Sequence, residues 1–174
     1  MLDAIGTYVS DHYIWFKCLH MVFAMIWVWS TSVAYTSYLV PAFRRWVRDP
    51  QNPDNIQMRN WVMERFDSGV ILEHIAFPVL LLTGPLLMLA GGWSPEDGWL
   101  AAKLVLVVLL FIPIELFDYY LSHFGGNKEM LRKAGKADAY EVSIHRHWWF
   151  LIVTTPIISI FAIGTLIIAI TKPF

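Results

Sequence analysis

The chain has 174 residues, of which 57% are hydrophobic and only 16% are charged, and its formal net charge is −1. Few soluble domains of this length are so apolar, and a net charge near zero gives no basis for expecting a nucleic-acid partner. The single cysteine, Cys18, excludes an internal disulfide and covalent c-type haem attachment. We expect one all-α integral membrane domain over residues 1–174.

Four apolar segments of membrane-spanning length follow one another along the chain. About 20 residues cross roughly 30 Å of hydrocarbon, and a backbone inside lipid must be helical to satisfy its own polar groups. The stretch GGWSPEDG is rich in helix breakers and predicts a tight turn between the second and third segments. The sequence therefore predicts a four-helix bundle with spans near residues 13–43, 68–90, 98–123 and 147–171.

The distribution of basic residues predicts how the bundle is oriented. Residues 44–67 and 124–146 together hold ten of the 13 lysines and arginines. The positive-inside rule places both segments in the cytoplasm and both termini outside. Within them, residues 55–66 and 127–140 are predicted to form short helices on the membrane surface, and lipid is the expected surrounding partner.

The first span begins with WFKCLH, which contains Lys17 and His20. His20 lies roughly 10 Å deep at 1.5 Å per residue, and Lys103 reaches a similar depth on the third span. A neutral imidazole is a standard axial haem ligand, and a buried amine that loses its proton also coordinates. Trp27, on the same face as His20, suits a flat macrocycle. The alternatives are lysines that extend to the interface and a hydrogen-bonded packing role for His20.

The cytoplasmic half of the predicted bundle holds a larger group of ionisable residues. His74 lies roughly 9 Å below the inner face, Glu115 reaches a similar depth, and Asp118 follows Glu115 by one turn on the same face. Carboxylates and imidazoles from several helices are typical ligands for copper, iron or zinc in a bundle. The candidate metal ligands in the chain are His20, Glu73, His74, Glu115, Asp118 and His147.

Other interpretations of this inner group stay open. His74 and His147 can instead hold a haem between two helices. Glu73 and Glu115 can be protonated, or paired with Arg65 or Arg146. The sequence does not determine which of three histidines face the bundle and which lie at the interface: His123, His145 and His147.

Several segments, in this order over residues 13–123, resemble those of a known family. They are YIWFKCLHMVFAMIWV with its WFKxxH pattern, MERF before the second span, Pro78 within it, and GWLAAKLVLVVLL at the start of the third. The chain resembles HemJ-type proteins, the bacterial membrane protoporphyrinogen oxidases, and the related CopD-type group. The resemblance implies the bacterial inner membrane, a b-type haem, His20 as its axial ligand and Lys103 as the other functional residue within the membrane.

Three functional hypotheses follow. The first is a haem b-binding membrane oxidoreductase that moves electrons, in porphyrin oxidation or with a quinone, while Glu115 and Asp118 relay protons to the cytoplasm. The second is a membrane protein that binds a metal ion through the inner Glu, Asp and His residues. The third is an accessory subunit of a larger membrane complex. Further copies of the chain, in a homo-oligomer, are the other protein partners considered.

Overall fold

The computed structural model describes residues 2–173, which form helices joined by short turns, with no strand in this range. Four helices are long and apolar enough to cross a membrane, and the shortest has 35 residues. At 1.5 Å per residue, 35 residues extend about 50 Å, well beyond the roughly 30 Å of hydrocarbon. The prediction of an all-α fold with four spanning-length helices is confirmed.

The helices follow in a simple order, with the first and third long helices each interrupted by a π-helical turn. The first long helix comprises α2 (Tyr13–Ala34), η1 (Tyr35–Leu39) and α3 (Val40–Arg48), and the short α1 (Leu2–Asp11) precedes it. The second comprises α4 (Pro53–Gly69) and α5 (Ile71–Ala90). The third comprises α6 (Gly98–Leu106), η2 (Val107–Phe111) and α7 (Ile112–His123), and the short α8 (Lys128–Lys133) follows it. The fourth is α9 (Ala137–Thr171).

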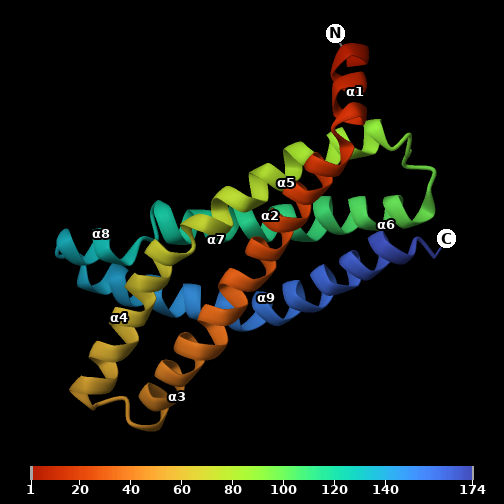
Figure 1. Ribbon diagram of the computed structural model, residues 1–174. Coiled ribbons are helices and arrows are strands. Elements are labelled where there is room, and N and C mark those ends of the chain that lie inside the picture. The colour runs from red at the N-terminus through yellow and green to blue at the C-terminus, as the bar shows by residue number, and fades with distance from the viewer. Residues whose placement is uncertain (1, 174) are drawn as a thin grey trace.

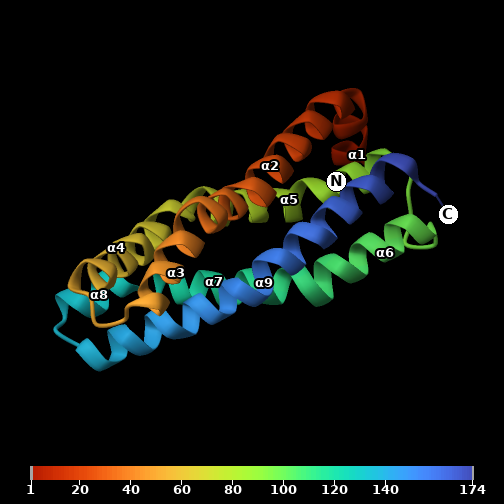
Figure 2. The same cartoon turned by 90° about the horizontal axis from the view of Figure 1, so that it is seen from below.

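The long helices form two hairpins. The first hairpin packs α2 along α5 and α3 against α4, and in the second α9 packs against α6 and α7. Figure 1 shows α1, the turn between α5 and α6, and the end of α9 at one end of the molecule. The turn between α3 and α4 lies at the other end with α8, and Figure 2 shows the same separation. The two basic segments therefore lie at the same end.

Two apolar clusters hold the hairpins together. In the first, near the basic end, the Phe43 ring stacks on Trp148 with centroids 3.8 Å apart. In the second, Trp27 lies against Phe77 and Phe111 near the middle of the bundle. Many other large apolar side chains point outward, as expected for a surface in contact with lipid rather than water.

A proline stands two residues after each π-helical turn. Pro41 follows η1 and Pro113 follows η2. A proline ring has no N–H to donate and collides with the carbonyl four residues earlier, which here belongs to Ser37 or Leu109 within the turn. The wider turn moves that carbonyl aside, so the long helices continue past their prolines.

Of the segments predicted as short surface helices, residues 127–140 do contain the short helix α8, and the rest is arranged differently. Residues 55–66 lie within α4, which continues through Val70 into α5, and residues 137–140 are the start of α9. The fourth helix thus begins at residue 137 rather than near 147. The buried side chains of this added part recur at helical spacing and face α4 and α8, which stabilises a helix there without an apolar sequence. They are Tyr140, Ser143, Ile144 and His147.

We predict that Phe43→Ala weakens the bundle, because it removes a fully buried ring stacked on Trp148 and leaves a cavity. The expected loss is about 3–5 kcal/mol of unfolding free energy. The matched control is Val47→Ala, one turn later on the exposed face of α3. Unfolding in mixed micelles, followed by circular dichroism, measures both. Equal stability of the two variants would contradict the proposed packing.

Candidate functional site

Asp118 on α7 lies between two histidines that come from two other helices. Its Oδ2 accepts a hydrogen bond from His74 Nε2 on α5 at 3.0 Å, and its Oδ1 accepts one from His147 Nε2 on α9 at 2.8 Å. All three side chains are buried. One carboxylate therefore joins three helices inside the bundle, where bulk water does not reach it.

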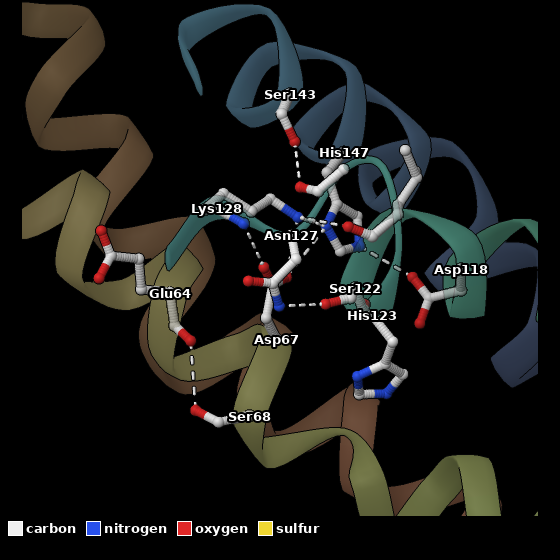
Figure 3. A network of polar contacts seen from close by, with 12 residues as sticks. Glu64, Asp67, Ser68, Asp118, Ser122, His123, Asn127, Lys128, Ser143 and His147 are labelled. Carbon is white, nitrogen blue, oxygen red and sulfur yellow. Dashed lines mark hydrogen bonds and ion pairs between the residues drawn. The ribbon is translucent and has the colours of Figure 1, made fainter. Parts of the chain in front are cut away.

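A second pair of charges extends this network toward α4 and α8 (Figure 3). Lys128 Nζ donates to Asp67 Oδ1 at 2.8 Å, to the Leu121 carbonyl at 3.3 Å, and to His147 Nδ1. An ammonium group has no acceptor, so His147 Nδ1 accepts and its Nε2 carries the proton donated to Asp118. Lys128 is fully buried and Asp67 nearly so, which makes this branch a closed one.

The other branch of the network leads to a partly exposed residue. His74 Nδ1 lies 2.7 Å from His123 Nε2, and the two rings meet edge to face with centroids 4.8 Å apart. His123 is the last residue of α7 and is half-buried, whereas His74 is buried. The imidazole pair therefore connects Asp118 with the surface of the basic end.

Two further carboxyls, on α5 and α7, are held by side chains of α2. Glu73 Oε2 accepts from Ser30 Oγ at 2.7 Å and from Thr31 Oγ1, and Glu115 Oε1 accepts from Trp27 Nε1 at 2.5 Å. Trp27, Ser30 and Thr31 share one face of α2 because residues three and four apart are neighbours on a helix. This face supplies the donors that buried carboxyls need.

His20 lies apart from this network, on α2 and beside α5. Its Nδ1 is 2.7 Å from Thr83 Oγ1, and Thr83 Oγ1 donates its own proton to the Val79 carbonyl at 2.7 Å. A hydroxyl has a single proton, so His20 Nδ1 is the donor to Thr83. Its Nε2 therefore carries a lone pair, and within residues 2–173 no hydrogen bond to that atom is found. Lys103 on α6 is close enough to interact electrostatically with His20.

The structure brings together only part of the predicted metal set. His74, Asp118 and His147 are in contact, Glu73 and Glu115 lie beside them, and His20 is separate. Both ring nitrogens of His74 and of His147 have hydrogen-bond partners, and Asp118 lies between the two rings. Over the described range, no group of three or more His, Cys, Asp or Glu residues has an arrangement suited to a metal ion.

The remaining predicted residues can also be placed. Trp27 belongs to the buried aromatic cluster and bonds Glu115, so its indole N–H already has a partner. His145, unlike His123 and His147, lies outside the network and packs edge to face on Trp46. The partners considered for Glu73 and Glu115 are elsewhere, since Arg65 lies over Trp61 and Arg146 is exposed.

Sequence reasoning missed Asp67, Lys128 and Thr83. Asp67 and Lys128 are 61 residues apart, in segments whose charge was interpreted only as an orientation signal. Arg59 was counted in the same way, yet it is buried and pairs with Glu141 at 2.6 Å. No spacing pattern marks such pairs, because each forms only when two distant helices meet.

The fold and the site define a multi-pass α-helical membrane protein with a network of ionisable side chains inside its bundle. Comparison with known proteins found no matching family model, no matching curated protein and no matching solved structure. The function must therefore be inferred from the chain's own residues.

We predict that Asp67→Ala destabilises the protein by about 3–5 kcal/mol, because it leaves the Lys128 ammonium buried without its carboxylate. The control is Glu129→Ala, which removes an exposed ion pair between Glu129 and Lys133, four residues apart on α8. This change should leave stability unchanged. Unfolding in micelles at low and high salt measures both. A small effect of Asp67→Ala that disappears in salt would show that the pair is solvated.

Proposed function

We propose that this chain is a haem b-binding protein of the bacterial cytoplasmic membrane that transfers electrons, with His20 as the axial iron ligand. The observation that carries the proposal is the hydrogen bonding of His20. Its Nδ1–H donates a hydrogen bond to Thr83 Oγ1, which leaves the lone pair of Nε2 to bind iron. Iron-ligating histidines typically donate their second ring N–H to a nearby acceptor, which orients the ring and selects the tautomer.

The surroundings of His20 suit such a group. The imidazole is half-buried, so part of its surface is accessible to a ligand. Lys103 lies close enough to His20 to interact with it electrostatically, and its ammonium group would pair with one of the carboxylates that haem b carries. A haem b bound by His20 supplies reversible one-electron redox chemistry.

The chain's own residues then have distinct tasks. Thr83 orients His20, while Lys103 supplies positive charge. The outward apolar side chains admit a lipid-soluble electron donor, such as a quinol or a porphyrinogen, from the side. The same assignment agrees with the resemblance of WFKCLH to the haem-binding helix of HemJ-type proteins.

We further propose that the basic end faces the cytoplasm, with both termini outside. Exposed basic residues gather at that end on α3 and after α7, namely Arg44, Arg45, Arg48, Arg132, Lys133 and Lys136. At the opposite end Lys172 lies over the Trp93 ring at 4.0 Å, a cation–π contact. Basic residues retained on one side of the membrane indicate the cytoplasmic side.

The haem assignment is tested by optical spectra of the purified protein, air-oxidised and then reduced with dithionite. The parent protein should show a Soret band and sharp reduced α and β bands, which His20→Ala abolishes. His145→Ala is the control, since that ring lies outside both the His20 group and the Asp118 network. No haem spectrum in the parent, or the same spectrum in His20→Ala, would overturn the proposal.

Thr83→Val offers a finer test. The valine keeps the shape of threonine but accepts no hydrogen bond, so the imidazole becomes a weaker electron donor. We expect haem to be retained and its midpoint potential to rise. An unchanged potential would show that Thr83 does not act on the ligand.

The orientation is tested by cysteine labelling in a Cys18→Ala background. A membrane-impermeant maleimide should label Ser94→Cys, between α5 and α6, in intact cells. Gln51→Cys, between α3 and α4, should react only after lysis. The reverse pattern would place the basic end outside.

A further inference from the structure

A small cavity of about 20 Å³ lies beside Asp118, between α2, α5, α7 and α9. The three carboxyl residues Glu73, Glu115 and Asp118 line it from α5 and α7, together with threonines of α2 and α9. A cavity of roughly 10–15 Å³ or more holds one water molecule if two to four polar groups face it. The cavity thus has the size and the lining of a site for a single water.

Thr155 on α9 gives an independent sign that a ligand belongs there. It is only 6% exposed, it lines the cavity, and its Oγ1 is buried without a hydrogen-bond partner among the described residues. The other threonines and the serine in the second half of α9 donate to the carbonyl four residues earlier: Thr154, Ser159, Thr165 and Thr171. Burying a hydroxyl without a hydrogen-bond partner is unfavourable, so a partner in the cavity is favoured.

We propose that a water molecule in this cavity, held by Thr155, joins the three carboxyls into a proton path that leaves the bundle through His74 and His123. The path needs no haem and is independent of the function proposed above. In it, a proton passes from Glu73 or Glu115 to the water, and the water passes one to Asp118. No electron or other reactant takes part.

The hydrogen bonds continue from Asp118 to the basic end. Asp118 Oδ2 is 3.0 Å from His74 Nε2, and His74 Nδ1 is 2.7 Å from His123 Nε2. His74 takes up a proton from Asp118 at Nε2 while its own proton is on Nδ1, and it releases the Nδ1 proton to His123 Nε2. The ring is then left in the Nε2–H tautomer that donates to Asp118, and return of a proton along the same bonds resets it. His123, which is half-buried, releases it to water at the surface.

The remaining charged groups around Asp118 form the closed branch. His147 on α9, Lys128 on α8 and Asp67 on α4 are all almost completely buried, so this branch does not reach water. It holds Asp118 in place and leaves the His74 side as the exit. At the opposite side of the cavity, Trp27 bonds Glu115 and packs on Phe77 and Phe111. These rings offer no proton acceptor, so the path does not continue through them, and the series of hydrogen bonds found among the described residues leads to the basic end.

The path is tested with the full-length protein in micelles, by infrared spectroscopy after rapid transfer into D₂O. The measured signal is the C=O stretch of protonated carboxyl groups, assigned by its loss in Glu73→Gln or Glu115→Gln. In the parent this band should shift quickly as deuterons enter from His123. In Thr155→Val and His123→Phe we expect the shift to be slower by on the order of a hundredfold, the usual effect of removing a proton-transfer group.

Two controls separate this path from general loosening of the bundle. Thr155→Ser keeps the hydroxyl and should restore fast exchange, and His145→Phe changes a half-buried histidine of α9 outside the network. Unchanged exchange in both Thr155→Val and His123→Phe would overturn the proposal. It would also be overturned by the absence of any protonated-carboxyl band in the parent, or by slow exchange in Thr155→Ser. Because optical spectra test the haem, either proposal can fail without the other.

Discussion

The need to satisfy every polar group without water governs this structure, and Asp118 is where three helices meet that need. Its two oxygens accept from His74 and His147, and the chain of contacts continues through Lys128 to Asp67. Removing any member leaves a charge or a donor in a medium that cannot solvate it. At the basic end, polar bonds between distant segments therefore act together with the apolar cluster around Phe43 and Trp148.

An aromatic cluster separates the two polar regions of the bundle. Trp27, Phe77 and Phe111 pack together beside Glu115. His20 lies on the same helix as Trp27, two turns closer to the N-terminus. A proton needs a continuous series of donors and acceptors, and apolar rings interrupt that series. An electron has no such requirement. A redox centre at His20 and a proton path from the basic end can thus lie near each other without a proton leak across the bundle.

Much of the architecture follows from local sequence. Apolar segments of 20 or more residues must become helices in lipid, and the turn GGWSPEDG ends one of them. The added length of α9 was harder to predict, since residues 137–146 alternate polar with apolar side chains instead of forming a continuous apolar run, and one face of this helical segment packs on α4 and α8. The site was foreseen as a level in the bundle that holds Glu73, His74, Glu115, Asp118 and His147. The sequence did not predict that hydrogen bonds from Asp118 separate into one branch through His74 and another through His147.

The sequence by itself determined the number of spanning helices, the gathering of basic residues at one end, and the common level of Glu73, His74, Glu115 and Asp118 in the bundle. Those properties depend on hydrophobicity and on the constant rise of a helix. Only the tertiary structure decided that His147 faces inward while His145 does not, that Lys128 is a buried partner of Asp67, and that Thr83 selects the tautomer of His20. Each of these depends on how one helix is rotated against another, and packing across the bundle sets that rotation rather than any spacing along the chain.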